Sequence, residues 1–304
     1  MLSRDFLSLR DCSPDELEQL LRTAEAIKRD GAGAALAGQT IALLFDKPSL
    51  RTRVSFEVAA GRLGGRAITV AQHEARIGER EPVRDAARVL SRMVQALVVR
   101  TFAQATLEDY ARWASVPVVN ALSDAEHPCQ ALADLLTLRE RCGTLRGVTL
   151  AYVGEGNNVA TALAYGAVLA GMRFRCASPP GHGLPDDVLV AAAALPGGGS
   201  VEQLDDPAAA VRDAAAVYTD VWASMGQEHL LTQRLEAFAA YRLDAALLAA
   251  APADALVMHD LPAHRGEEIT DEVMESPRSV VFDQAENRVH AQQALLLLLL
   301  GAAG

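Results

Sequence analysis

The sequence predicts an α/β protein with two doubly wound parallel-sheet domains and a cleft between them. Its 304 residues exceed what one typical core holds, since domains usually contain roughly 100 to 200 residues. Short apolar runs alternate with longer amphipathic ones, which is the pattern of buried parallel strands covered by helices on both faces. The pattern starts again after GTLRG at 143–147, so we expect a second sheet there.

The first predicted helix spans residues 14–29. Ser13 suits the N-cap position, Pro14 the first turn and Glu16 a capping box, while Gly31 follows the basic last turn. The apolar runs that follow predict four strands, each succeeded by a helix, at 40–46, 67–71, 96–102 and 116–122.

The second half predicts another parallel sheet. Its apolar runs lie at 148–154, 173–178, 215–222 and 255–262. We place the domain boundary near a helix at 128–142 and expect the final helix, 286–300, to pack back onto the first domain. The predicted domains are therefore 1–135 together with 286–304, and 136–285.

Composition limits the classes of function. A net charge of -11 argues against nonspecific nucleic-acid binding. The four cysteines form no CxxC pair, so neither a disulfide framework nor a zinc site is indicated. The leucine run 295–300 is far shorter than the roughly 20 apolar residues that cross a bilayer, and the N-terminus lacks a signal-type apolar stretch. We therefore expect a cytoplasmic protein that binds no membrane.

Ligands of open parallel sheets bind beyond the carboxyl ends of the strands, so the loops there are the candidate sites. The loop DKPSLRTRVSFE gathers two hydroxyls and two guanidinium groups, from Ser49, Arg51, Thr52 and Arg53. At a helix N-terminus these groups predict a phosphate site that is not a P-loop. The alternative is that Ser49 only caps the helix and the arginines are solvated or pair with Glu57.

Later strand ends in the first half add further polar side chains. Arg100 and Asn120 follow apolar runs, and His127 and Gln130 lie where the helix of 128–142 begins. One histidine or glutamine alone would more often be an ordinary cap or core hydrogen bonder. Their recurrence at successive strand ends predicts one composite site.

The second half contains GEGNNVA at 154–160, which resembles a dinucleotide loop only superficially. Val159 occupies the third glycine position, and the next predicted strand carries no acidic residue to hold a ribose, so a nicotinamide cofactor is disfavoured. Asn157 and Asn158 begin a helix, where one amide should cap it and the other is free to contact a ligand.

Two more strand ends carry acidic groups. DVWASMG supplies Asp220, Ser224 and Met225, with helix capping by Asp220 as the alternative. LVMHDLPAH, at 256–264, places Asp260 at the mouth of a buried strand, where a carboxylate has to be neutralised, hydrogen-bonded or used. Its alternative role is to cap the turn before Leu261.

These stretches together resemble the aspartate/ornithine carbamoyltransferase family over nearly the whole chain. The matching segments are SLRTR (49–53), the VLSRM-to-Arg100 stretch, HPCQALADL (127–135), GEGNNV (154–159), DVWASMG (220–226), HDLPAHRGEEIT (259–270) and AENRVHAQ (285–292). The resemblance implies two α/β domains, a homotrimer or a multiple of trimers, and no metal or organic cofactor. It implies transfer of a carbamoyl group from carbamoyl phosphate to the side-chain amine of L-ornithine, as in arginine metabolism.

The resemblance also assigns roles to residues. It implies that carbamoyl phosphate is bound by Ser49, Leu50, Arg51, Thr52, Arg100, His127, Gln130, Leu261 and Arg288. It implies that ornithine is bound by Asn158, Asp220, Ser224 and Met225. The catalytic residues would be Arg51, Arg100, His127 and Asp260.

Asp260 departs from the pattern, because the family motif is His-Cys-Leu-Pro. A carboxylate binds an ammonium well but also keeps it protonated and so poorly nucleophilic. Three hypotheses follow: an ornithine enzyme, a carbamoyltransferase for another amine, and a weakened paralogue with a binding or regulatory role. The sequence does not decide between them, nor between biosynthetic and catabolic flux.

Overall fold

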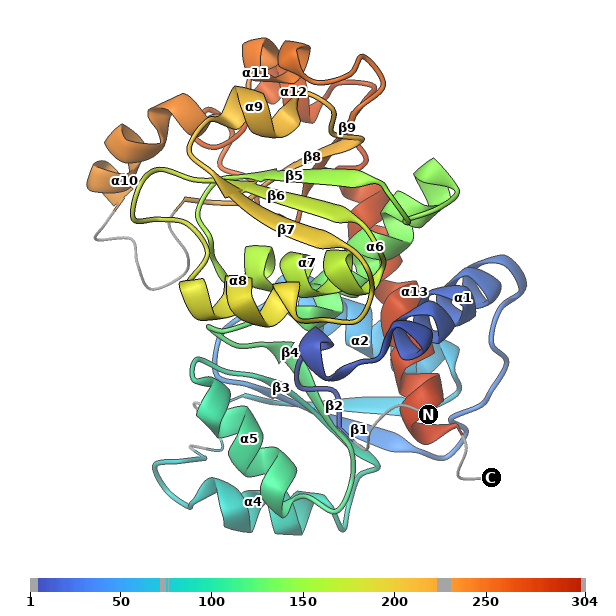
Figure 1. The fold of residues 1–304 in the computed structure, drawn as a ribbon. Helices are drawn as coiled ribbons and strands as arrows, with labels where there is room; N and C mark the ends of the chain where they lie inside the picture. The colour runs from blue at the N-terminus through green and yellow to red at the C-terminus, as the bar shows by residue number, and fades with distance from the viewer. Residues whose placement is uncertain (1–4, 72–74, 76, 223–230, 302–304) are drawn as a thin grey trace. The chain divides into compact units, whose positions relative to one another are not determined.

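The computed structural model describes residues 5–71, 75, 77–222 and 231–301. The chain divides into two compact units. Unit 1 comprises Met1–Leu136 with Glu286–Gly304, and unit 2 comprises Thr137–Ala285. Both divisions fall inside helices, α6 (Pro128–Cys142) and α13 (Val281–Leu300). Each unit has its own parallel sheet with flanking helices (Figure 1), which confirms the prediction of two α/β domains with parallel sheets.

The sheet of unit 1 has the strand order β2-β1-β3-β4, and every pair in it is parallel. Its strands are β1 (Thr40–Phe45), β2 (Arg66–Ala71), β3 (Ala96–Arg100) and β4 (Val118–Leu122). Since β1 pairs with both β2 and β3, the strand order reverses between β1 and β3. The register shifts between Val99 and Arg100, at the carboxyl end of β3.

Helices cover both faces of this sheet. They are η1 (Leu9–Asp11), α1 (Pro14–Asp30), α2 (Leu50–Arg62), α4 (Val83–Leu90) and α5 (Gln104–Trp113), with the parts of α6 and α13 that belong to unit 1. Leu44, Leu97 and Val99 pack against α4 and α5 in one buried cluster. The predicted capping box of α1 is present.

The sheet of unit 2 has the order β7-β6-β5-β8-β9 and is also entirely parallel. Its strands are β5 (Thr149–Val153), β6 (Arg173–Ala177), β7 (Ser200–Leu204), β8 (Ala216–Thr219) and β9 (Leu256–His259). Here the strand order reverses between β5 and β8.

The helices of unit 2 also lie on both faces of their sheet (Figure 1). They are α7 (Asn158–Leu169), α8 (Asp186–Ala193), α9 (Pro207–Val211), α10 (Leu231–Phe238), η3 (Ala239–Tyr241), α11 (Ala245–Ala250) and α12 (Asp271–Met274). Val153, Val217 and Val257 share one core cluster with α9, α11 and α12. Across the described part of the chain, no helix is both long and apolar enough to cross a membrane.

Three expectations need correction. The sequence pattern missed β7, an edge strand with no buried residue, because it lacks an apolar run. The last helix begins at Val281 rather than at residue 286. Asn120 lies inside β4 rather than beyond its end, and its amide donates to the carbonyl of Leu7 at 2.9 Å. It therefore fixes the N-terminal segment.

Candidate active site

In each unit, the carboxyl ends of the two strands at the reversal point carry the predicted polar residues. In unit 1 the loop after β1 leads to Ser49, and Arg100 ends β3. In unit 2 the loop after β5 leads to Asn157, and Asp220 follows β8. Ligands of open parallel sheets bind at such reversal points.

The loop after β1 begins helix α2. Ser49 is the N-cap, and its hydroxyl accepts a hydrogen bond from the backbone N–H of Thr52 at 3.2 Å. Leu50 is 74% exposed, so its side chain is not part of a core. Arg53 is exposed and pairs with Glu57 at 2.9 Å, which is the alternative that the sequence left open. Ser49 therefore caps the helix and Arg53 pairs with Glu57, while phosphate binding by this loop, including the half-buried Arg51, stays a prediction.

Arg288, on α13, joins two other helices of unit 1. One terminal nitrogen, Nη2, donates to Thr52 Oγ1 at 2.6 Å, and the other, Nη1, donates to Gln130 Oε1 at 3.1 Å. All three side chains are buried. Gln130 is oriented in turn by its amide, which donates to Asp134 Oδ1 at 2.8 Å. The structure thus brings together the predicted residues Thr52, Gln130 and Arg288.

His127 and Arg100 are buried in the same unit, at 3% and 8% exposure. Burial, together with the positive charges of Arg288 and Arg100, holds the pKa of His127 well below its usual range. The imidazole is therefore neutral at pH 7. Its Nδ1 has no hydrogen-bond partner among the described residues. A neutral imidazole beside two guanidinium groups is suited to polarising a carbonyl that lies next to a bound anion.

Sequence reasoning also missed the buried charged residues Lys47 and Glu126 of unit 1. Lys47 is the second residue after β1 and is 7% exposed. Glu126, 3% exposed, directly precedes His127. Both lie next to motifs that were recognised, so their positions beside strand and helix ends were the available signal.

In unit 2, Asn157 organises the loop after β5. Its Oδ1 accepts from the N–H groups of Val159 and Ala160, which makes it the N-cap of α7. Its amide donates to Asp220 Oδ2 at 2.6 Å. We expected one of the two asparagines to cap this helix, and Asn157 does so. Asn158 follows as the first residue of the helix.

The loop after β8 is described only in part. Asp220 is 5% exposed, and its Oδ1 accepts from the N–H of Val221 at 2.7 Å. Ser224 and Met225, which were predicted to contact the amino acid, lie outside the described residues. Where the description resumes, the buried Arg234 donates to the carboxylate of Glu155 and to the carbonyl of Trp222. Arg234 therefore joins the loops that follow β5 and β8.

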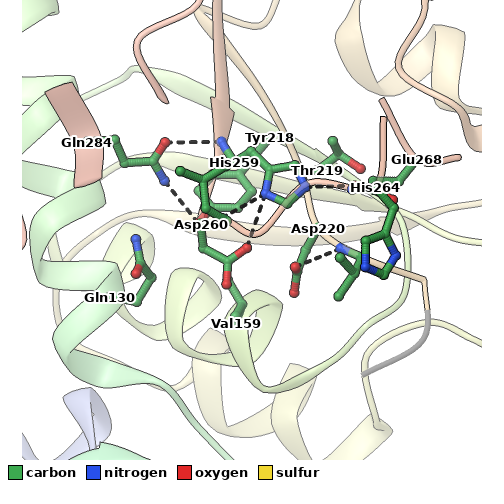
Figure 2. Close-up of polar contacts among 12 residues, drawn as sticks. Gln130, Val159, Tyr218, Thr219, Asp220, His259, Asp260, His264, Glu268 and Gln284 are labelled. Atoms are coloured by element: carbon green, nitrogen blue, oxygen red, sulfur yellow. Dashed lines mark hydrogen bonds and ion pairs between the residues drawn. The ribbon is translucent and has the colours of Figure 1, made fainter. Parts of the chain in front are cut away.

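His259, the last residue of β9, is fully enclosed and lies between two carboxylates (Figure 2). Its Nε2 is 3.1 Å from Glu268 Oε1, and its Nδ1 is 3.4 Å from Asp260 Oδ1. Burial alone would lower its pKa, but the two carboxyl groups outweigh burial and raise the pKa to about 9. The backbone N–H of Leu261 also donates to Nδ1 at 2.9 Å, and this contact favours the unprotonated nitrogen. Nδ1 can therefore either accept the hydrogen bond from Leu261 or carry a proton that faces Asp260.

Asp260 and Asp220 form a carboxyl pair in unit 2. Burial raises the pKa of Asp220 well above its usual range, and the adjoining Asp260 carboxyl raises it further. Two carboxylates in contact cannot both ionise freely, so the pair holds one proton and one negative charge. The turn-capping alternative for Asp260 fails for the N–H of Leu261, because His259 accepts it.

The same cluster has the residue types of a metal site. Asp220, His259 and Asp260 each place a ligand atom within 4.8 Å of the others. Both ring nitrogens of His259 already have hydrogen-bond partners, however. A metal ion would have to displace one of them, so the geometry favours a proton-holding network.

Leu261 has a positive φ of 61° and precedes Pro262 in a cis peptide. A bulky side chain rarely adopts this left-handed backbone conformation. No feature of the sequence predicted this conformation. Leu261 was predicted to contact carbamoyl phosphate, and its half-buried position in unit 2 does not by itself test that role.

Comparisons with known proteins agree with this arrangement. Residues 4–140 match the aspartate/ornithine carbamoyltransferase carbamoyl-P binding domain, and residues 146–299 match the Asp/Orn binding domain of the same family. The ornithine carbamoyltransferase of Acidothermus cellulolyticus is 53% identical, over 99% of this chain and 98% of that protein.

Solved structures give the same result. The ornithine carbamoyltransferase of Pyrococcus furiosus superposes with a TM-score of 0.95 at 46% identity, covering 99% of this chain and 98% of the other. That of Gloeobacter violaceus gives a TM-score of 0.90 at 50% identity, covering 98% and 99%. With two parallel sheets, polar residues at both reversal points and matches over nearly its whole length, the chain belongs to the aspartate/ornithine carbamoyltransferase family.

Proposed function

We propose that this protein transfers the carbamoyl group of carbamoyl phosphate to the side-chain amine of L-ornithine, giving L-citrulline and phosphate. The observation that carries the proposal is the buried set of Arg100, His127 and Arg288 in unit 1. Two guanidinium groups and a neutral imidazole are enclosed there beside a helix N-terminus. Such a set of positive charges beside a neutral hydrogen-bond donor suits an anionic ligand.

The donor chemistry follows from these groups. The dianionic phosphate of carbamoyl phosphate suits the amides at the start of α2 and the guanidinium of Arg51. Arg288 and Gln130 offer polar atoms to the carbamoyl oxygen and nitrogen. His127, being neutral, can donate to the carbamoyl oxygen as negative charge develops on it during attack. Unit 1 therefore neutralises the leaving group and polarises the carbonyl.

The acceptor chemistry belongs to unit 2. A cationic amino acid needs a carboxylate for its amino groups, and Asp220 and Asp260 supply one shared negative charge. We propose that Asn158, at the first turn of α7, holds the α-carboxylate through its amide and the helix dipole. Ser224 and Met225 are proposed to complete this site on the strength of the DVWASMG motif.

The attacking amine must lose a proton first, because its reference pKa is about 10.4. The ionised carboxylate of the Asp220 and Asp260 pair can take that proton, which leaves both carboxyl groups neutral and the amine uncharged for attack. His259 lies next to Asp260 and is backed by Glu268. The His259 imidazole can therefore offset the negative charge of the Asp220 and Asp260 carboxyls while the amine proton is transferred.

A second candidate function rests on Asp260 itself. A full carboxylate at this position, where the family resemblance places a cysteine, would hold a second cationic group more tightly than a thiol does. That preference favours another amine acceptor. A weakened paralogue is a third possibility, although the buried donor set described above does not favour it.

A product assay separates these functions. The protein is given carbamoyl phosphate and, in turn, L-ornithine, L-lysine or putrescine, and the ureido product is measured. Ornithine should give by far the largest kcat/KM. The Asp220→Asn variant should lose at least about 100-fold, whereas Asp205→Asn, at an exposed position, should match the parent. A preference for another amine would establish the second function, and no product with any amine would leave only the third.

We further propose a homotrimer and a cytoplasmic location, as the family motifs imply. Light scattering on the purified protein should give about three times the 32.3 kDa of one chain, or a multiple of that mass. A monomeric mass would refute the assembly.

A further inference from the structure

Lys47 is a buried cation that none of the steps above uses. It is one of only two lysines in the chain and lies in the loop between β1 and helix α2. Its side chain is 8% exposed. Enclosing an ammonium group is costly unless it is paired and hydrogen-bonded, so its contacts indicate what it does.

The contacts of Lys47 join three loops of unit 1. Its Nζ donates to Asp124 Oδ1 at 2.5 Å, in the loop after β4, and lies 4.0 Å from the ring centroid of Phe102, in the loop after β3. The backbone N–H of Asp124 in turn donates to the carbonyl of Phe102 at 2.8 Å. Lys47 itself belongs to the loop after β1.

Each of these three loops leads to a residue of the proposed donor site. Ser49 and Arg51 follow Lys47 within four residues, Arg100 comes two residues before Phe102, and His127 comes three residues after Asp124. A shift of the ammonium group would therefore move all three parts of the site together. Positioning errors of about 1 Å can reduce a rate by roughly a hundredfold.

The ion pair also has an electrostatic effect. The side chain of Asp124 is 62% exposed and carries a negative charge at the edge of the sheet where a dianion has to arrive. The contact with Lys47 cancels that charge. Without Lys47, the Asp124 carboxylate would repel the phosphate.

We propose that Lys47 is a positioning residue for the phosphate-bearing donor: it holds the loops after β1, β3 and β4 together and neutralises Asp124 beside them. This inference rests on the proposed function for the identity of the donor. It needs only that the site take a phosphate group.

Calorimetry on the whole chain tests the inference with inorganic phosphate and carbamoyl phosphate as probes. Lys47→Met should raise both Kd values at least about tenfold, the effect expected for a charge-assisted contact. The KM for ornithine at saturating donor should stay within about twofold of the parent. Lys28→Met, which replaces the other lysine, should bind phosphate like the parent.

A second substitution separates this role from general support of the fold. In Lys47→Met with Asp124→Asn, the repelling carboxylate is gone, so part of the lost affinity should return. Phe102→Leu, at a half-exposed position, removes the aromatic face without changing charge and should raise the phosphate Kd about threefold. This variant keeps the inference testable even if Lys47→Met does not fold.

Three results would overturn the inference: an unchanged phosphate Kd in Lys47→Met, no recovery in the double variant, or parent-like binding in Phe102→Leu. A parent that binds phosphate but forms no citrulline refutes the proposed function alone. A parent that binds neither probe refutes both.

Discussion

Glu126 should make the stability of unit 1 fall as pH rises from about 4.5 to about 7. Its carboxyl accepts hydrogen bonds from the hydroxyl of Ser8 and, at 2.7 Å, from the N–H of Leu9, and it directly precedes His127. Burial raises its pKa from 4.5 to about 7, although the contacts with Ser8 and Leu9 act in the opposite direction.

The sign and size of the effect follow from this pKa. Below pH 4.5 the group is protonated in the folded and unfolded chain, so it costs nothing. Between pH 4.5 and 7 only the unfolded chain ionises, and the free energy of unfolding falls by about 1.4 kcal/mol per pH unit. Above pH 7 the loss of unfolding free energy levels off at about 3 kcal/mol, which corresponds to the rise of the pKa from 4.5 to about 7. Stability from this group is therefore present at low pH and lost on the way to pH 7.

The Glu126→Gln variant removes the ionisation but keeps an oxygen for the N–H of Leu9. Its free energy of unfolding should match the parent at pH 4.5 and exceed it by about 3 kcal/mol at pH 8. Urea unfolding in a Trp222→Phe background leaves Trp113, in unit 1, as the fluorescent reporter, because the chain has two tryptophans. Glu81→Gln, at an exposed position, is the matched control.

The reasoning fails if the unfolding free energies of Glu126→Gln and its parent run parallel between pH 4.5 and 8. It fails equally if the difference has the opposite sign at pH 8. Ionisation of Glu126 should also affect donor binding. Its carboxyl is hydrogen-bonded to the N-terminal segment, and Glu126 directly precedes His127. Donor binding in the parent should therefore weaken above pH 7 more than in Glu126→Gln.

Three further predictions concern the proposed substrate sites. Arg51→Ala should abolish calorimetric binding of millimolar carbamoyl phosphate, whereas Arg53→Ala, which removes only a surface ion pair, should bind like the parent. Equal loss of binding in both variants would contradict a specific role for Arg51. Asp260→Asn should shift the acidic limb of the kcat/KM profile for ornithine to lower pH, because it removes a group that raises the pKa of Asp220. Asp260→Cys should raise turnover with ornithine. Parent-like pH profiles and turnover in both variants would show that Asp260 has no role in the reaction. Arg234→Met should raise the KM for ornithine about tenfold with donor affinity unchanged, since it frees the loops after β5 and β8, and a change in donor affinity would contradict this.

The fold was predictable because most strands of parallel sheets are apolar on both faces. ALVVR at β3 and TLAYV at β5 are fully buried, and runs of this kind stand out in a sequence. SVEQL at β7 pairs with β6 alone and buries none of its residues. Its strand conformation comes from the neighbouring strand rather than from its own composition, so the sequence carried little signal of it.

The position of a polar side chain was predictable where it lies directly at the end of a strand, as for Arg100, Asp220 and Asp260. It was not predictable where function depends on pairing between distant residues. Lys47 is hydrogen-bonded to Asp124, 77 residues away in the sequence, and Ser8 to Glu126, 118 residues away. Position in the sequence cannot show that such charges are buried together, because their burial arises only when the loops assemble.

The Asp260 side chain changes the protonation of its neighbours. A strand-end carboxylate needs a proton, a donor or a ligand; here Asp220 shares a proton with it and the ring of His259 lies 3.4 Å away. His259 in turn has Glu268 on its other side at 3.1 Å. A thiol at position 260 would leave Asp220 with less electrostatic opposition and His259 with one carboxylate instead of two, so both pKa values would fall. The carboxylate therefore makes the network a stronger proton acceptor and a stronger ammonium binder at once, and the balance of these two effects decides how fast an acceptor amine can react.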